Sequence, residues 1–152
     1  MIAKKVELQG ITSTNVRTSI VAVANALQAV PFDIRPQAAP DGTVTLLFTD
    51  IENSTPLNER LGDARYMELL RAHNALIDEQ VRRHDGRVVK TIGDGYMVAF
   101  TSARRGLECA IAIQRKLTAS QELRGVRVRI GLHTGEMVKQ GDALVVRPVN
   151  LP

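Results

Sequence analysis

The sequence predicts an α+β domain in which helices pack on one face of a mixed β-sheet. Residues 43–50 form an apolar, β-rich run that ends in a carboxylate. Residues 87–100 form two further β-rich runs around a Gly-Asp-Gly turn, which is the pattern of a hairpin. Residues 63–84 and 102–117 carry apolar side chains at helical spacing. Strands that alternate with amphipathic helices bury the apolar stripe of each helix against the sheet.

Length and composition fit one folded domain. The chain has 152 residues, and 44% of them are hydrophobic, which is enough to build a core. The net charge of +4 comes from Lys and Arg scattered among acids, and only 3% of residues are aromatic. Such a surface argues against nucleic-acid binding, although a basic balance suits an anionic nucleotide. The single cysteine, Cys109, excludes an internal disulfide and a zinc cluster, and we expect a structural or exposed thiol in a reducing compartment.

No apolar run reaches the length needed to cross a bilayer. The best candidate, residues 20–30, contains Asn25 and Gln28, and the polar stretch before it is long for a signal peptide. The sequence therefore predicts a cytoplasmic protein without a membrane span.

Three segments are expected along the chain. Residues 1–30 are predicted to be an extension of one short strand and one helix, which Pro31 ends. Residues 31–42 are rich in proline and read as a linker, and residues 43–152 form the main domain. The extension is either a regulatory or dimerising helix or a packing helix without a further role.

Asp50 and Asp94 are the candidate metal ligands. Asp50 ends the first β-rich run, and Asp94 lies at the tip of the Gly-Asp-Gly turn. If the two strands lie side by side, the carboxylates meet at one edge of the sheet, where they repel each other unless a divalent cation lies between them. Oxygen ligands with few protein partners suit Mg²⁺ or Mn²⁺. Taken singly, each aspartate also fits a structural role as a helix cap or turn former.

Four motifs, taken together, resemble those of the class III nucleotide cyclases, the adenylate and guanylate cyclase catalytic domain. They are Phe48-Thr-Asp-Ile51 with Ser54-Thr55, Lys90-Thr-Ile-Gly-Asp-Gly95, Gly131-Leu-His-Thr-Gly135 and Pro148-Val-Asn150, in the family's order. The resemblance covers roughly residues 42–150. It implies a ferredoxin-like core and the conversion of ATP to cyclic AMP and pyrophosphate by a two-metal mechanism.

The resemblance also implies roles for the residues around the two aspartates. Asp50 and Asp94 match the catalytic metal-binding aspartates, which hold two Mg²⁺ or Mn²⁺ ions together with the backbone carbonyl of Ile51. The following residues, Asn53, Ser54 and Thr55, would offer backbone N–H groups at a helix start to the β- and γ-phosphates.

Two further residues match positions that contact the nucleoside. Lys90 corresponds to the lysine that helps to read the adenine ring, and Asn150 corresponds to the catalytic asparagine that orients the ribose. Sites of this family form between two protomers, so the resemblance implies a homodimer or pairing with another cyclase chain.

The sequence departs from the family pattern after residue 142. The family has an arginine a few residues beyond Asn150 that stabilises the transition state, whereas the sequence stops at Pro152. Loss of such a contact costs about 3 kcal/mol or more. Residues 143–146 lack the usual aromatic-glycine pair and second base-reading residue, which leaves the purine choice to Lys90.

These departures lead us to expect a C-terminally incomplete, weakly active or inactive cyclase domain. The alternatives are a noncatalytic nucleotide-binding or regulatory module that pairs with a complete cyclase chain, and a copy that folds but binds nothing. Two histidines have no expected catalytic role: His73 lies on the apolar stripe of residues 63–84 and is expected to be a partly buried packing residue, and His133 is expected to be structural.

Overall fold

The computed structural model describes residues 34–140 and 143–148. In chain order the elements are η1 (Arg35–Gln37), β1 (Thr43–Ile51), α2 (Ser54–Leu61), α3 (Asp63–Arg83), β2 (Arg87–Ile92), β3 (Gly95–Phe100), α4 (Ala103–Ala119), β4 (Val128–Gln140) and β5 (Ala143–Pro148). The strand and helix predicted within residues 1–30 lie outside the described residues, and so does Asn150. The division of the chain into extension, linker and main domain stays a prediction.

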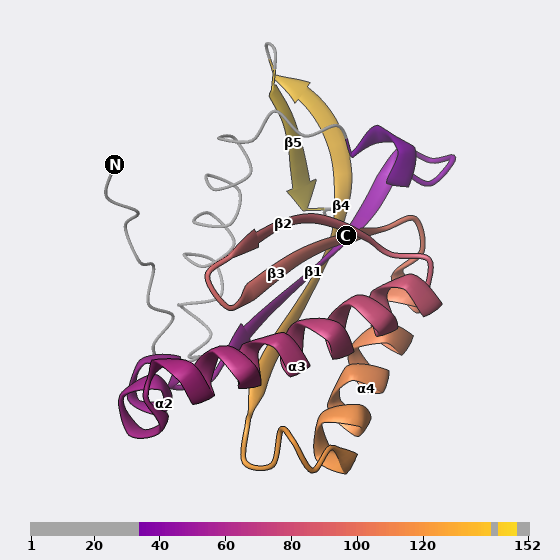
Figure 1. Cartoon of the computed structure of the whole chain (residues 1–152). Coiled ribbons are helices and arrows are strands. Elements are labelled where there is room, and N and C mark those ends of the chain that lie inside the picture. Colours follow the sequence, from indigo (N-terminus) through magenta and orange to yellow (C-terminus); the bar gives the residue numbers. More distant parts are fainter. Residues whose placement is uncertain (1–33, 141–142, 149–152) are drawn as a thin grey trace.

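The sheet has the strand order β2-β3-β1-β4-β5 (Figure 1). The predicted α+β class, with helices on one face of the sheet, is confirmed. In one detail the sheet differs from the expectation of mixed strand directions, because all four neighbouring pairs are antiparallel. Helical connections run from β1 to β2 and from β3 to β4, and each joins two parallel strands. A third strand separates the members of each pair, so no parallel strands become neighbours.

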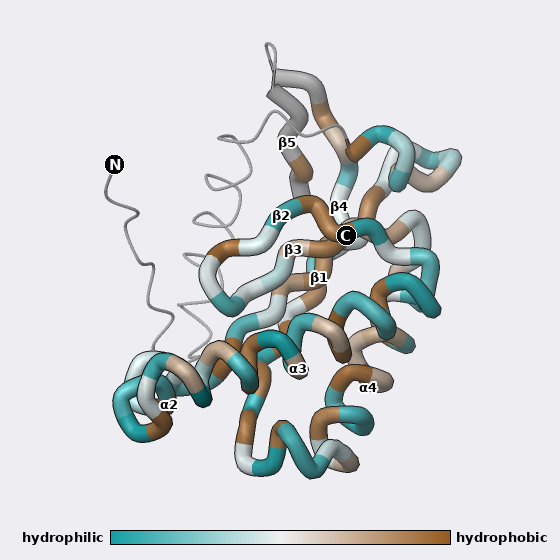
Figure 2. Tube along the Cα trace, viewed as in Figure 1, coloured by the Kyte–Doolittle hydropathy of each residue, from teal (hydrophilic) through white to brown (hydrophobic). Residues whose placement is uncertain are grey.

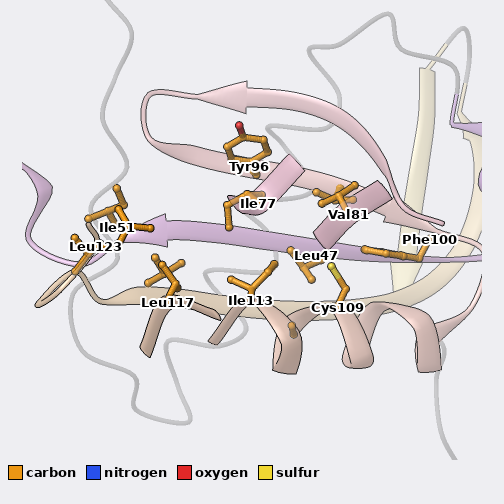
Figure 3. Close-up of a cluster of buried hydrophobic side chains, with 14 residues drawn as sticks. Leu47, Ile51, Ile77, Val81, Tyr96, Phe100, Cys109, Ile113, Leu117 and Leu123 are labelled. Atoms are coloured by element: carbon orange, nitrogen blue, oxygen red, sulfur yellow. The ribbon is translucent and has the colours of Figure 1, made fainter. Parts of the chain in front are cut away.

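The main core lies between the sheet and the helices. Helices α3 and α4 alternate hydrophobic and hydrophilic residues along their length (Figure 2), and their apolar sides face β1 and β3. Figure 3 shows the buried side chains that meet there, which include Leu47, Ile51, Ile77, Val81, Tyr96, Phe100, Cys109, Ile113, Leu117 and Leu123. Within the described part of the chain, none of these helices is both long and apolar enough to span a bilayer.

Cys109 belongs to this core. Its side chain is 0% exposed, and burial raises the pKa of its thiol to about 11. Of the two roles left open for this cysteine, the structure therefore supports the structural one, and the thiol stays protonated at neutral pH.

A second buried cluster lies on the opposite face of the sheet. Successive residues of a strand point to opposite faces, so Leu46 and Ala99 lie away from the helices while their neighbours enter the main core. Met97 and Val44 are buried on the same face, and Ile34 packs against them. Part of the proline-rich segment therefore contacts the sheet.

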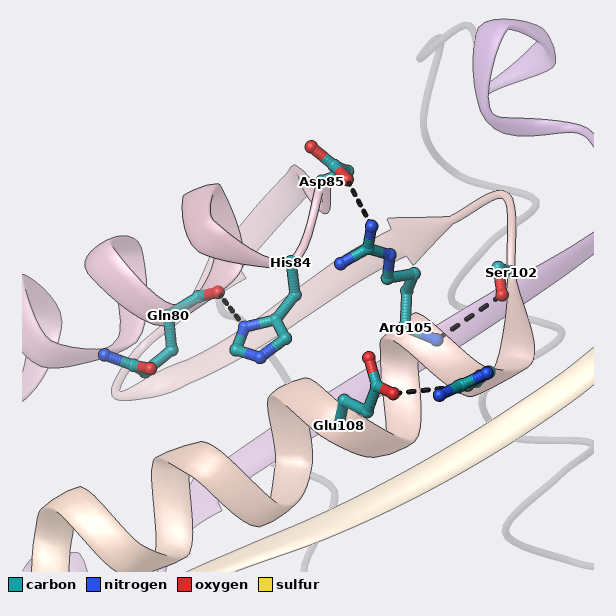
Figure 4. A network of polar contacts seen from close by, with 7 residues as sticks. Gln80, His84, Asp85, Ser102, Arg105 and Glu108 are labelled. Atoms are coloured by element: carbon teal, nitrogen blue, oxygen red, sulfur yellow. Dashed lines mark hydrogen bonds and ion pairs between the residues drawn. The ribbon is translucent and has the colours of Figure 1, made fainter.

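Polar contacts tie the end of α3 to the start of α4 (Figure 4). The Ser102 hydroxyl caps α4 by accepting a hydrogen bond from the Arg105 backbone N–H at 3.4 Å, and the Arg105 guanidinium lies 3.6 Å from the Asp85 carboxylate. His84 Nδ1 lies 2.7 Å from the Gln80 carbonyl oxygen. Exposed ion pairs of this kind contribute little stability, so the capping bond is the main determinant of this helix start.

Candidate active site

The pairing of β1 with β3 brings Asp50 close to Asp94. Thr49 pairs with Tyr96, and the Tyr96 backbone N–H donates to Thr49 Oγ1 at 3.1 Å. Asp50 follows Thr49 directly, and Asp94 lies in the turn two residues before Tyr96. The two strands thus lie side by side, and the two carboxylates are near enough for the charge of Asp50 to affect the pKa of Asp94.

The glycines on both sides of Asp94 are needed for this turn. Gly93 has φ +61°, in the left-handed region that side chains other than glycine rarely adopt. At Gly95 a Cβ atom would lie only 2.7 Å from the backbone oxygen of Thr49. The Gly-Asp-Gly sequence therefore lets the turn approach the end of β1 closely, with one carboxylate between the glycines.

The Asp94 carboxyl is partly withdrawn from solvent. Burial raises its pKa above the ordinary value of 3.8 and the Asp50 charge raises it further, while a hydrogen bond from the Ser54 hydroxyl and the nearby His73 oppose the rise. Its Oδ2 atom is buried and has no hydrogen-bond partner among the described residues. A carboxylate in this position favours a positively charged ligand.

Asp50 is more open and has a cation beside it. Its Oδ2 atom lies 2.6 Å from Arg129 Nη2, and the two residues pair directly across β1 and β4. Just beyond the ends of these strands, Arg127 Nε lies 3.2 Å from Glu52 Oε2. Neither arginine was predicted from the sequence as a site residue.

A hollow of about 600 Å³ borders this end of the sheet. Glu52, Arg124, Arg127 and Arg129 line it together with side chains from the end of α4. Neither Asp50 nor Asp94 lines this hollow, although Arg129 borders it and contacts Asp50. The two aspartates therefore lie outside the arginine-lined hollow but next to it.

Helix α2 begins at Ser54, four residues after Asp50. Asn53 has φ 54° and ψ 41°, a left-handed conformation that asparagine tolerates better than most residues. This bend lets Ser54 and Thr55 open the helix, whose first backbone N–H groups have no partners within the helix itself. The Ser54 hydroxyl also hydrogen-bonds to Tyr66, and the pKa of Tyr66 is raised by burial and by Asp94. Tyr66 was not predicted from the sequence as part of the site.

The remaining predicted residues occupy different positions. The Ile51 side chain is in the core, so only its backbone can serve as a ligand. Lys90 lies on β2 opposite Met97, and Met97 lies opposite Phe48. This row crosses the sheet on the face away from the helices. His73 is fully buried, whereas a partly buried position was expected, and His133 is half-buried.

The residues at the strand ends fit a magnesium or manganese site. Among the described residues, no group of three or more His, Cys, Asp and Glu side chains is arranged to hold a metal. Asp50 and Asp94 would thus share an ion with backbone carbonyls, substrate phosphates and water, which is the ligand set that Mg²⁺ prefers. A cation would also relieve the repulsion between the carboxylates and satisfy the buried Asp94 oxygen. The roles of the individual site residues stay predictions.

Comparison with known proteins gives one consistent result. The model of the adenylate and guanylate cyclase catalytic domain matches residues 37–146. An adenylate cyclase of Mycosarcoma maydis is 35% identical over 134 residues, which cover 74% of this chain but 5% of that protein. The chain spans between 5% and 36% of the length of the curated relatives that it matches.

Solved structures agree with the sequence relatives. An adenylate cyclase of Trypanosoma brucei, described in its monomeric state, has a TM-score of 0.59 and 27% identity over 71% of this chain and 64% of its own. A double mutant of the guanylyl cyclase domain of the RhoGC fusion protein of Blastocladiella emersonii has a TM-score of 0.58 and 27% identity over 63% of this chain and 59% of its own. Both nucleotide specificities thus occur among the similar structures.

Proposed function

Because the chain belongs to the adenylate and guanylate cyclase catalytic domain family, we propose that it is an adenylate cyclase-type domain that converts ATP to cyclic AMP and pyrophosphate in cyclic nucleotide signalling. The main support is the juxtaposition of Asp50 and Asp94, whose charges interact at the ends of two neighbouring strands. A two-metal site for phosphoryl transfer needs carboxylates in this arrangement.

The chain's own residues would position the nucleotide. Asp50 and Asp94, with the carbonyl of Ile51, would hold two Mg²⁺ or Mn²⁺ ions. Divalent cations at such a site lower the pKa of an attacking hydroxyl and neutralise phosphate charge. The backbone N–H groups of Asn53, Ser54 and Thr55 would bind the β- and γ-phosphates at the start of α2.

Positive charge at the same end of the sheet supports a triphosphate ligand. Arg129 touches Asp50, and Arg127 and Arg124 line the neighbouring hollow. Guanidinium groups bind phosphate oxygens in paired hydrogen bonds, so these arginines favour an anionic ligand beside the metal carboxylates.

ATP is the proposed substrate because Lys90 matches, in the sequence motif, the lysine that helps to read the adenine ring. In the proposed homodimer, each site takes its metal carboxylates from one protomer and takes Lys90 and Asn150 from the other. We place this dimer in the cytoplasm.

The test is cyclic AMP production from Mn·ATP by the purified chain over a series of protein concentrations. Activity should rise faster than linearly with concentration, because the site needs two copies, and should vanish in Asp94→Ala. Mn·GTP in the same assay measures the purine preference. Equal turnover by the parent and Asp94→Ala would refute the two-carboxylate site.

Mixing two inactive variants tests the shared site directly. Asp94→Ala and Lys90→Ala damage opposite halves of a composite site, so a mixed dimer keeps one intact site. Half of randomly formed dimers are mixed, and the mixture should regain roughly a quarter of the parent activity. No recovery would argue for a site within one protomer.

The alternative of a noncatalytic partner module gives a different pattern in the same assays. The departure from the family pattern at residues 143–146 favours it. The parent chain alone would then make no cyclic AMP, whereas Mn·ATP would still raise its melting temperature and a complete cyclase chain would restore turnover.

A further inference from the structure

Two buried polar atoms near the carboxylate end of the sheet lack hydrogen-bond partners among the described residues. One is Asp94 Oδ2, and the other is Nε2 of His73. The His73 side chain is 0% exposed, so bulk water does not satisfy its ring nitrogen. Buried polar atoms are nearly always paired in folded proteins, and two unpaired ones in the same region call for a physical reason.

The structure places these two side chains near each other. The His73 ring meets the Tyr96 ring edge-on, with 6.2 Å between the ring centroids. Tyr96 follows Asp94 by two residues at the start of β3, so helix α3 presents His73 to the segment that carries the carboxylate. His73 is also close enough that its ring, when protonated, would favour the charged form of Asp94.

We propose that His73 is a positioning residue for Asp94, in which Nε2 donates a hydrogen bond to a bridging water molecule that in turn donates to Oδ2. The bond would hold the carboxyl group so that its other oxygen faces the metal ion. This inference rests on the proposed metal-dependent function of Asp94.

The other ring nitrogen of His73 already has a partner. Nδ1 lies 3.0 Å from Oδ1 of Asn74. The Asn74 amide can present either its oxygen or its NH₂ group to Nδ1, because the two orientations have nearly the same shape. With the NH₂ group there, Nδ1 accepts, and Nε2 of the neutral ring carries the proton that it donates to the bridging water.

A packing role alone does not explain a histidine at this place. An apolar side chain of similar size would fill the same space between α3 and Tyr96 without a buried nitrogen to satisfy. A water-bridged hydrogen bond to a metal carboxylate gives the nitrogen a partner and fixes a ligand that would otherwise rotate.

Three variants separate positioning from packing. His73→Phe keeps an aromatic ring but removes the donor, and His73→Gln keeps a donor. Ile77→Val, one turn farther along the same face of α3, removes a methyl group from a fully buried residue and serves as the stability control. The probe is Mn²⁺ with 3′-deoxy-ATP, which lacks the attacking hydroxyl, and calorimetry gives the Mn²⁺ dependence of its binding.

Loss of the positioning bond should weaken Mn²⁺ affinity by roughly 10-fold to 100-fold in His73→Phe. His73→Gln should recover most of this loss, and Ile77→Val should lower the melting temperature without changing Mn²⁺ affinity. Parent-like affinity in a folded His73→Phe protein would overturn the proposal and leave His73 as a packing residue.

A metal-independent measurement tests the contact itself. The ¹⁵N spectrum of the His73 imidazole should show a protonated Nε2 in the parent, and its shift should change in Asp94→Asn. An unchanged Nε2 shift in that variant would overturn the contact. If Asp94→Asn binds the Mn²⁺ probe like the parent while the His73 shift still responds, the metal site is wrong and the contact stands. If Asp94→Asn loses binding and His73→Phe does not, only the positioning role fails.

Discussion

The middle and the end of strands β1 and β3 have opposite environments. In the middle, Leu47 and Val98 are completely buried against the helices. At the end, Asp50 is half-exposed beside Arg129, and the partly buried Asp94 has a raised pKa. The same pair of strands therefore gains stability from burial in one place and loses stability from burial and charge repulsion in the other. Sites that bind a ligand commonly retain such unfavourable arrangements because the ligand relieves them.

The largest expected effect is on the apolar side of this comparison. Phe100→Ala should lower the free energy of unfolding by about 3–5 kcal/mol, because the change leaves a cavity in the main core. Urea denaturation followed by circular dichroism measures the loss. Leu107→Ala on the exposed side of α4 is the matched control, and it should change stability by less than about 0.5 kcal/mol. Similar losses in both variants would show that Phe100 is not in a tightly packed core.

Gly95→Ala should affect both regions because this residue joins the strand to the carboxylate turn. A Cβ atom 2.7 Å from the Thr49 oxygen forces β1 and β3 apart, at a cost of about 1–3 kcal/mol. The displaced turn should also weaken Mn²⁺ binding, which calorimetry measures beside the urea midpoint. Gly93→Ala tests the turn without the contact to Thr49. A Gly95→Ala protein as stable as the parent would contradict the close approach.

Asn53→Ala should have a smaller effect, confined to the site end. The left-handed conformation of Asn53 costs an alanine about 1 kcal/mol, and Asn53→Gly should be neutral or slightly stabilising because glycine adopts it freely. Unfolding midpoints of the two variants measure the difference. Equal midpoints would mean that the bend at the start of α2 relaxes without cost.

Asp94→Asn should have the smallest effect on stability, and its sign is opposite to that of the core variant. Folding raises the pKa of Asp94 above its ordinary value of 3.8. The charged form is therefore disfavoured in the folded chain, and stability falls as the pH rises from the unfolded pKa through the folded pKa. Without metal, Asp94→Asn should be more stable than the parent at neutral pH and lose this advantage in acid. Urea midpoints across this range measure the effect, and a difference independent of pH would contradict it.

Much of the fold follows from local patterns in the sequence. The predicted helices at residues 63–84 and 102–117 correspond closely to α3 (Asp63–Arg83) and α4 (Ala103–Ala119). Both helices bury a continuous apolar stripe, and this periodicity is visible in a single sequence. The antiparallel pairing of all neighbours was not predicted, because strand order depends on contacts between segments distant in the sequence.

In the candidate site, too, local features were predicted from the sequence and contacts between distant segments were not. The ends of strands and a Gly-Asp-Gly turn pointed to Asp50 and Asp94, since these features are local. Arg129 was missed because its partner is 79 residues away and only the register of β1 and β4 brings them together. The burial of His73 could be read from its place on an apolar stripe, but its nearness to Asp94 depends on how α3 crosses β3.

The buried thiol of Cys109 can report how often the core of this chain opens. It is the only cysteine among 152 residues, and a reagent that attacks thiolates meets a group with a pKa of about 11 inside the core. The reagent can therefore label Cys109 only when α4 separates from the sheet. The labelling rate then measures how often this separation occurs. A nucleotide that binds only the closed form would slow the labelling of Cys109 in proportion to its occupancy. Nucleotides that are bound but not turned over could therefore be ranked by how much they slow the labelling.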